Sequence, residues 1–226
     1  HADGNGFGKM FLNFDRLVKA LTSSDDNEIY KRLLHDFSKS LDEIAKAAFQ
    51  SALEVVFELW QQRQVARATP GKFLPVVPLV VGGDDLTVVC DGKLAIPFTT
   101  AYLQAFEEQT AKEGVVGDLA EKRETPIRRL GACAGVAIIK PHFPFYAAYG
   151  LAEELLKSAK VVKSKLNDWP CSALDVHVLY DASGPELERI RTEWTLDRDH
   201  TLLTSRPLVV TPEENLAEVP QGEIWI

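Results

Sequence analysis

Residues 74–90 read Leu-Pro-Val-Val-Pro-Leu-Val-Val-Gly-Gly-Asp-Asp-Leu-Thr-Val-Val-Cys, and this stretch decides the fold. Two valine-rich runs, 74–81 and 86–90, flank a tight turn of two glycines and two aspartates, which is typical of a β-hairpin. Pro75 and Pro78 cannot donate a hydrogen bond to a neighbouring strand, so the first strand should open near an edge or a bulge. We expect Gly82 and Gly83 to allow the positive φ angles of the turn.

Upstream of the hairpin, apolar residues recur at every third or fourth position, which predicts one long amphipathic helix. Asp25, Asp26 and Glu28 mark its start, and Pro70-Gly71 marks its end. Before it, residues 3–8 (Asp-Gly-Asn-Gly-Phe-Gly) form a glycine-rich turn. Downstream, we expect a helix over about 99–112, a loop over the charged stretch 113–130, a buried strand over 131–139 and an amphipathic helix over 144–166.

In order, these elements give helix, strand, strand, helix, strand, helix. One further strand before Asp3 completes βαββαβ, the ferredoxin-like palm arrangement of the α+β class, an antiparallel sheet with helices on one face. We expect this palm to span 1–168. A C-terminal α/β extension, 169–226, should pack on it with a strand over 173–180, a short helix over 186–194 and a strand over 202–210.

The composition limits the partners. A formal charge of −8 argues against a large basic surface for duplex nucleic acid, but not against small polyanions that divalent metals bridge to carboxylates. Three widely spaced cysteines favour a reducing cytoplasm over a disulfide framework. We expect no membrane span and no signal peptide. Because the chain opens at His1 without an initiator methionine, we also expect that upstream residues were removed or are not recorded.

Three carboxylates are candidates for chemistry. In the palm topology, Asp3 at the end of the first strand meets Asp84 and Asp85 at the hairpin tip, and the three repel one another unless cations lie between them. Mg²⁺ prefers such oxygen ligands, and two ions about 3.5–4 Å apart can activate a hydroxyl and stabilise a leaving oxygen. The backbone amides of residues 4–8 form a candidate nest for triphosphate. Each segment alone is also an ordinary solvated turn, but together, at these positions, they favour chemistry.

At these residues the chain resembles a known family. Residues 80–86 (Val-Val-Gly-Gly-Asp-Asp-Leu) resemble the GGDD motif of the polymerase-like large subunit of type III CRISPR effector complexes, whose palm is related to GGDEF diguanylate cyclases. Residues 3–8 are similar to that family's first metal motif. The segments 135–144 and 151–160 are similar to its strand and helix after the hairpin, and 172–179 and 205–208 to segments downstream of its palm.

The resemblance implies synthesis of cyclic oligoadenylate or a cyclic dinucleotide from ATP with Mg²⁺ or Mn²⁺, as a signal in CRISPR-like antiviral defence. Asp3, Asp84 and Asp85 would be the catalytic metal ligands. Lys160 would neutralise triphosphate, with Lys140 a weaker candidate for the same role. The other nucleotide-binding residues would be Gly4, Asn5, Gly6, Phe7, Gly8, Gly82 and Gly83. Asn5 departs from the family, which usually has a second acidic residue there. With one palm only, the reaction would need a second copy in a homodimer or another palm partner.

Two alternatives stay open. The first is a non-catalytic palm that binds nucleotide or acts as a scaffold, which Asn5 and the single palm favour. The second is an enzyme resembling diguanylate cyclases that uses GTP, since no residue is identified that reads the base edge. Two His/Asp pairs, His35-Asp36 and Asp199-His200, are interpreted as surface residues, and the lysines at 157, 160, 163 and 165 as a mostly solvated helix face.

Overall fold

The computed structural model describes residues 1–65, 72–112, 114–124, 126, 128–165, 171–180, 187–196 and 201–212. Its centre is a six-stranded mixed sheet in the order β2-β3-β1-β4-β5-β8. The strands are β1 (Ala2–Gly4), β2 (Val76–Gly82), β3 (Asp85–Cys90), β4 (Ala132–Ile138), β5 (Ala173–Val178) and β8 (Leu208–Val209). Only β4 and β5 pair in parallel, and the other neighbours are antiparallel. Two short strands, β6 (Thr195–Leu196) and β7 (Thr201–Leu202), form a separate ribbon.

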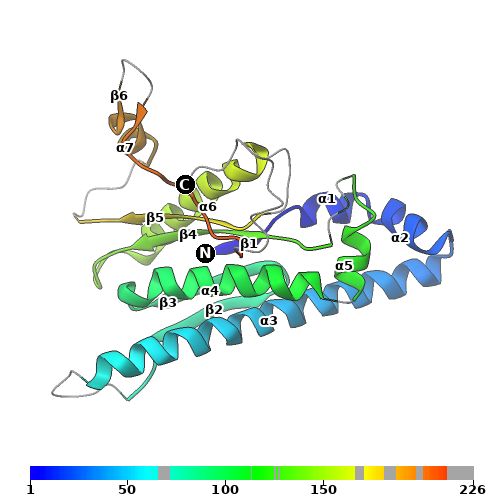
Figure 1. Ribbon diagram of the computed structural model, residues 1–226, viewed down its shortest axis with the longest axis horizontal. Helices are drawn as coiled ribbons and strands as arrows, with labels where there is room; N and C mark the ends of the chain where they lie inside the picture. Colours follow the sequence, from blue (N-terminus) through cyan, green and yellow to red (C-terminus); the bar gives the residue numbers. More distant parts are fainter. Residues whose placement is uncertain are drawn as a thin grey trace.

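Helices cover both faces of the sheet (Figure 1). They are α1 (Phe7–Leu12), α2 (Phe14–Thr22), α3 (Asn27–Val65), α4 (Gly92–Ala111), α5 (Val115–Ala120), α6 (Phe145–Lys165) and α7 (Leu187–Glu193). The 39-residue α3 and α4 lie against one face, and α6 lies against the other. None of the helices in the described ranges is both long and apolar enough to cross a membrane.

The α+β palm class is confirmed, with one difference in how its layers are built. The sequence predicted helices on one face, but α6 packs on the opposite face of β4. Small residues along β4 make this possible: a Cβ on Gly135 would overlap the Ala152 carbonyl and approach the backbone of Leu156 on α6. Alternate positions of β4, Ala134 and Val136, face the core under α3 and α4. Because successive side chains of a strand point to opposite faces, β4 packs against α6 on one face of the sheet and against α3 and α4 on the other.

The hairpin, the long helix and the strand at β4 are confirmed close to their predicted bounds, whereas three segments differ. The first strand was expected before Asp3, but β1 (Ala2–Gly4) contains Asp3. The helices α1 and α2 then follow between this strand and Asp25, where the sequence predicted only a turn. The stretch 113–130 is not all loop, because the apolar spacing of Val116, Leu119 and Ala120 buries one side of α5. The strand expected over 202–210 is reduced to β8 in this sheet, with Pro207, which has no amide hydrogen, next to it.

The helix after the hairpin begins at Gly92 rather than near 99. The Asp91 side chain caps it by accepting a hydrogen bond from the Lys93 amide at 2.8 Å, and Pro97 lies inside its second turn. This cap is the ordinary N-terminal signal of an Asp residue. It fixes the direction in which α4 leaves the hairpin and returns beneath the sheet.

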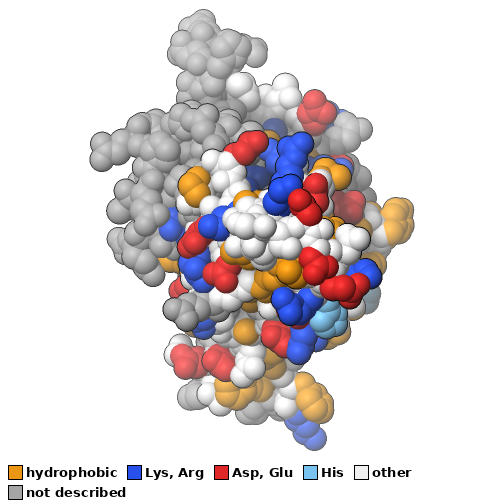
Figure 2. Space-filling model, turned by 90° about the vertical axis from the view of Figure 1, so that its right-hand side faces the viewer, with side chains coloured by type: hydrophobic (Ala, Val, Ile, Leu, Met, Phe, Trp, Pro, Cys, Tyr) orange, Lys and Arg blue, Asp and Glu red, His pale blue; other side chains and the backbone are white. Residues whose placement is uncertain are grey.

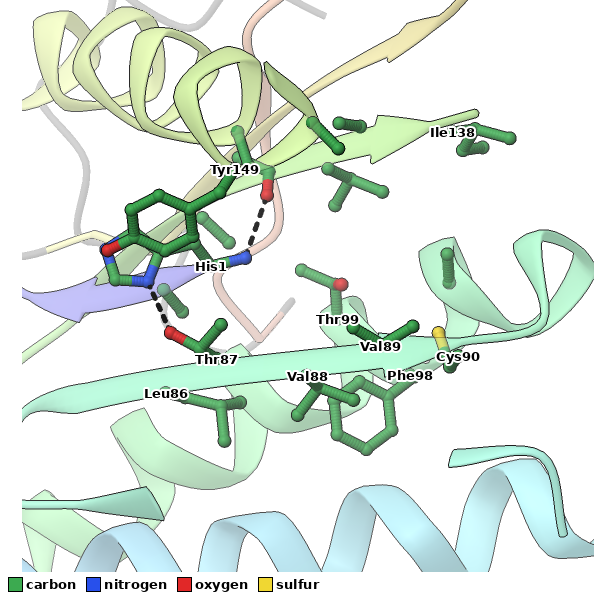
Figure 3. Close-up of a pocket in the computed structure, with 18 of the residues that line it drawn as sticks. His1, Leu86, Thr87, Val88, Val89, Cys90, Phe98, Thr99, Ile138 and Tyr149 are labelled. Carbon is green, nitrogen blue, oxygen red and sulfur yellow. Dashed lines mark hydrogen bonds between the residues drawn. The ribbon is translucent and has the colours of Figure 1, made fainter. Parts of the chain in front are cut away.

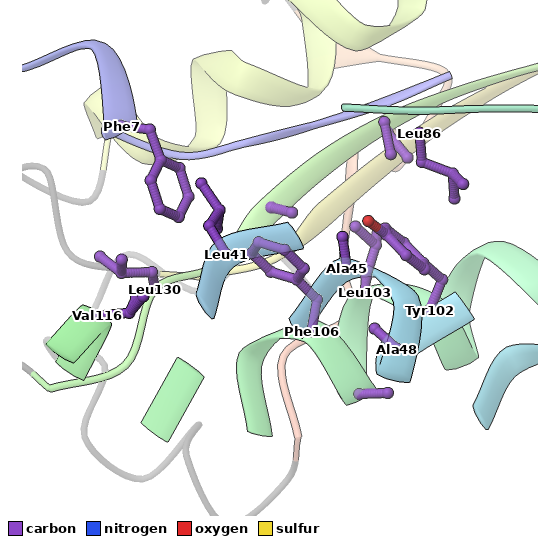
Figure 4. Close-up of a cluster of buried hydrophobic side chains, with 14 of the residues drawn as sticks. Phe7, Leu41, Ala45, Ala48, Leu86, Tyr102, Leu103, Phe106, Val116 and Leu130 are labelled. Atoms are coloured by element: carbon purple, nitrogen blue, oxygen red, sulfur yellow. The ribbon is translucent and has the colours of Figure 1, made fainter. Parts of the chain in front are cut away.

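The main core lies between the sheet and the helices α3, α4 and α5. Figure 4 shows Phe7 from α1, Leu41 and Ala45 from α3, Phe106 from α4 and Leu86 from β3 converging in it. All of these side chains are at most 4% exposed. Phe7 therefore anchors the glycine-rich segment to the core, so that the backbone on either side of it has little freedom to move.

A buried carboxylate fixes the segment beyond α6 to this core. Glu107 of α4 is fully buried, pairs with Arg129 at 3.0 Å and accepts hydrogen bonds from Ser172 at 2.8 Å and Thr211 at 3.1 Å. These partners come from the approach to β4, the start of β5 and the chain after β8. The palm sheet thus continues into β5 and β8, while the domain boundary at 168 stays a prediction.

Substituting Gly135 tests the close packing of α6 on the sheet. We expect Gly135→Ala to lower the free energy of unfolding by about 3 kcal/mol, because its new methyl group meets backbone atoms that cannot move aside. In the control Gly150→Ala, the added methyl group lies on α6 in open space and should raise that free energy by roughly 0.5–1 kcal/mol. Chemical denaturation measures both. Equal effects of the two substitutions would contradict this packing.

Candidate active site

The candidate site is organised by the position of β1 between β3 and β4. Asp3 lies directly opposite Asp85 on β3 and opposite Cys133 on β4. The next residue, Gly4, donates its amide hydrogen to the Asp84 carbonyl at 3.0 Å. Opposed residues of an antiparallel pair present their side chains on the same face, with Cβ atoms about 4.5–5.5 Å apart. The register therefore brings Asp3 and the GGDD turn together, as the topology predicted.

Asp84 is in the turn and contacts the start of the glycine-rich segment. A Cβ on Gly4 would lie 2.8 Å from the Asp84 Cβ and would overlap the Phe7 ring, so only glycine fits there. Burial raises the pKa of the Asp84 carboxyl above its ordinary value, and the negative charge of Asp85 raises it further. Two adjacent carboxylates in a partly desolvated turn thus repel each other, and a bound cation would relieve this repulsion.

A lysine from α6 meets the acidic residues from the other side. Lys160 forms an ion pair with Asp3, and both side chains are partly exposed. Desolvation and, less strongly, the positive charge of Lys163 lower the pKa of Lys160. One helical turn separates Lys160 from Lys163, so both lie on the same side of α6. The lysine cluster of α6 is therefore only partly a solvated face.

A cavity of about 470 Å³ joins these groups. Acidic side chains (Asp3, Asp84), basic side chains (Lys9, Lys160, Lys163) and the backbone of residues 4–6 and 8 line it. It is near the end of the molecule where α1 and α5 lie, and Figure 2 views that end, with basic side chains grouped beside acidic ones in its upper half. Such a pairing of carboxylates with cations is what a metal–triphosphate complex requires.

The glycine-rich segment offers fewer backbone amides to a phosphate than the predicted nest over residues 4–8. The amides of Gly4 and Asn5 are committed to the sheet, since they donate to the Asp84 and Gly131 carbonyls at 3.0 and 2.9 Å. Phe7 is a core residue, 1% exposed. Gly6, with φ +85°, and Gly8 border the cavity. In the GGDD turn only Gly83 has a positive φ, +61°, whereas Gly82 lies in the strand against Asp42.

Asn5 has a structural position. Its side chain is 4% exposed and donates through Nδ2 to the Cys171 carbonyl at 2.9 Å and to Cys133 Sγ at 3.3 Å. Both partners accept hydrogen bonds, which an amide satisfies and a carboxylate does not. The departure from the family's acidic residue is thus explained by what surrounds position 5. Asn5 joins β1 to the starts of β4 and β5.

Lys140 lies far from these residues. It follows the end of β4, seven residues after Cys133, the partner of Asp3. At about 3.3 Å per residue of strand this places it more than about 20 Å from the acidic cluster. Its side chain is exposed. The structure brings the other charged residues of the predicted site together, but not this lysine.

A second cavity, of about 170 Å³, lies between β3 and β4 where they extend beyond the first residue of β1 (Figure 3). His1 closes one end, with its Nδ1 2.9 Å from Thr87 Oγ1 and its amino group donating to the Gly135 carbonyl at 3.1 Å. The walls are mostly apolar, and its described lining residues include no Asp, Glu, Lys or Arg. The acidic and basic side chains of the candidate site thus lie in the other cavity.

The acidic residues suit a hard divalent cation by their chemistry. Asp3 and Asp85 are opposed on neighbouring strands, and Asp84 adjoins them in the turn. Within the described ranges, however, no three His, Cys, Asp or Glu side chains are gathered closely enough to hold a metal ion. At Asp3 the carboxylate is paired with the Lys160 ammonium group instead.

Replacing Asn5 tests its structural role. Asn5→Asp restores the family's usual acidic residue, but it sets a buried carboxylate against two acceptors, so we expect the free energy of unfolding to fall by at least about 1–3 kcal/mol. The control Asn13→Asp loses an exposed hydrogen bond to the Lys9 carbonyl, where water can replace the lost partner, and should change it by no more than about 0.5–1 kcal/mol. Thermal denaturation of both proteins, with and without Mn²⁺, is the measurement. An Asn5→Asp protein as stable as the wild type without metal would argue against this role.

Comparison with known proteins agrees with this geometry. The family described as Cas10/Cmr2, second palm domain, matches residues 1–167. No curated protein matches the chain. The matched range contains β1, the GGDD hairpin, α6 and every residue of the acidic and basic groups described above. The chain belongs to the Cas10/Cmr2 second palm domain family, the nucleotide-cyclase-related palm of type III CRISPR systems.

Proposed function

We propose that this chain is a metal-dependent nucleotidyltransferase that joins or cyclises ATP with release of pyrophosphate. The observation that carries the proposal is the register of β1, which opposes Asp3 and Asp85 beside the GGDD turn, at a cavity also lined by Lys160 and Lys163. The ATP preference and the cyclic oligoadenylate product rest on family membership. The predicted role as a signal in antiviral defence has the same support.

The proposed reaction is the transfer of a nucleotidyl group, and the charged residues of the site would hold the metal ions and the triphosphate. A 3′ or 2′ hydroxyl oxygen of one nucleotide loses its proton to water and bonds to the α-phosphorus of another. The bond from that phosphorus to the bridging oxygen breaks, and pyrophosphate leaves. Asp3, Asp84 and Asp85 would hold divalent ions, which make the hydroxyl more acidic and neutralise the leaving group. Lys160 and Lys163 would face the triphosphate. Catalysis then comes mainly from positioning and electrostatics.

The ion pair between Lys160 and Asp3 gives Lys160 a second role. Without nucleotide, the ammonium group balances the Asp3 charge. When metal and triphosphate bind, the carboxylate can turn to the metal and the ammonium to a phosphate oxygen. Each charged group thus has a partner both before and after binding, which lowers the cost of desolvating the site.

A second candidate is a non-catalytic palm that binds nucleotide. Two observations favour it: Asp3 is already paired with Lys160, and the described residues hold no ready group of three metal ligands. A third, an enzyme using GTP, stays open because no base-reading residue is identified. For the catalytic cases we expect a homodimer or a second palm partner.

The assay for pyrophosphate and nucleotide products separates these candidates. With ATP and Mn²⁺, we expect Asp84→Asn and Asp85→Asn each to reduce pyrophosphate release by at least about 100-fold, since each removes a charge at the reacting centre. The control Asp25→Asn, at an exposed surface pair with Lys19, should keep full activity. Parallel incubations with the four triphosphates identify the base.

Mass spectrometry of the products and calorimetry of ATP binding complete the test. Unchanged turnover in both variants would exclude the proposed metal ligands. ATP binding by the wild type without any product would instead support the non-catalytic palm.

A further inference from the structure

A second positive group reaches the glycine-rich segment from α5. Arg123 lies just after α5, where its amide donates to the Ala120 carbonyl at 3.2 Å. Its Nη2 atom is 3.1 Å from the point that a Cβ on Gly6 would occupy, and Lys163 Nζ is 3.3 Å from the same point. Two cations from segments about 40 residues apart thus meet at one glycine of the cavity wall.

The acidic and basic side chains around this cavity come from different elements, and the ion pair of Lys160 with Asp3 joins the two groups. Asp3 and Asp84 lie at the β1 and hairpin side, while Lys9, Lys160 and Lys163 line the wall formed by α1 and α6. Arg123 adds a fourth positive charge next to Gly6. Lys163 and Arg123 both approach Gly6, so two like charges lie close together and repel each other at this point. A polyanion with three or four negative charges would relieve it.

The segment that carries Arg123 is held in place on both sides. Val116 and Leu119 bury one face of α5 in the core. Downstream, Arg128 pairs with Asp118 at 3.0 Å and with Glu121 at 3.2 Å, on either side of the end of α5. The buried face of α5 therefore fixes the position of the Arg123 backbone, although Arg123 itself lies outside a helix. Binding a ligand there requires little ordering of the backbone.

We propose that Arg123 is a triphosphate-binding residue of this site, which holds the β- and γ-phosphates together with Lys163. The proposal rests on the proposed function of the same cavity and specifies its substrate as a nucleoside triphosphate. A guanidinium group presents parallel N–H donors that match two phosphate oxygens at once, which an ammonium group cannot do. Arg123 would select against nucleotides that lack the terminal phosphates.

Calorimetric titration with ATP, ADP and AMP tests this selectivity. Ca²⁺ replaces Mn²⁺ to suppress turnover. We expect Arg123→Gln to weaken ATP binding by about 10- to 100-fold, the range for losing a charged hydrogen-bond pair, and to leave AMP binding unchanged. Arg123→Lys should lie in between. The control Lys122→Gln removes the neighbouring exposed charge and should leave ATP affinity as in the wild type. Melting curves establish that all variants are folded.

The outcomes separate this inference from the enzymatic one. Selective loss of ATP affinity supports Arg123 even if no product is ever formed. Product formation with undiminished ATP affinity in Arg123→Gln overturns the role of Arg123 alone. Equal loss for ATP and AMP also overturns it, because the effect would not depend on the terminal phosphates. A wild-type protein that binds no ATP overturns both.

Discussion

The pairing of β1 between β3 and β4 is the constraint on which the rest of the structure depends. Ala2 and Asp3 pair with both neighbours, Gly4 pairs with β4, and this register decides which side chains meet. A shift by one residue would turn Asp3 into the core and Ala2 towards α6, because side chains alternate along a strand. Two residues just after β1 hold this register. Phe7 is buried in the core, and the Asn5 side chain is hydrogen-bonded next to the starts of β4 and β5. The chemistry of the site is thus a consequence of strand pairing.

The same arrangement explains why the site combines opposite charges. The acidic residues come from the sheet, at the end of β1 and in the turn between β2 and β3. The basic residues come from helices and their ends, above all α6 and the segment after α5. A sheet edge that carries only carboxylates would repel a triphosphate, and a helix face that carries only lysines would repel a metal ion. Together they favour the complex of the two, and the ion pair of Asp3 with Lys160 joins the acidic group to the basic one.

Much of this could be predicted from the sequence, for identifiable reasons. The hairpin and α3 follow from local patterns, since valine runs around Gly-Gly-Asp-Asp and a 3.6-residue apolar period need no knowledge of distant partners. The opposition of Asp3 and Asp85 followed from topology. The role of Asn5 could not be predicted, because its partners lie 128 and 166 residues away. Arg123 was missed because α5 is short and lies within a charged stretch that reads as a loop. Lys140 was included because it lies in a segment that resembles the family, but β4 carries it to the far end of the sheet.

The central claim is that Asp3, Asp84 and Asp85 share divalent ions at one end of the sheet. Paramagnetic broadening of backbone amide signals by Mn²⁺, measured with a non-hydrolysable ATP analogue, tests it without relying on turnover. Because broadening falls steeply with distance, signals of residues 2–6, 83–86 and 132–134 should disappear first, while those of 90–92 and 138–140 at the opposite end of the same strands persist. Uniform broadening, or broadening centred on residues other than the GGDD turn and β1, would contradict a metal site at these carboxylates.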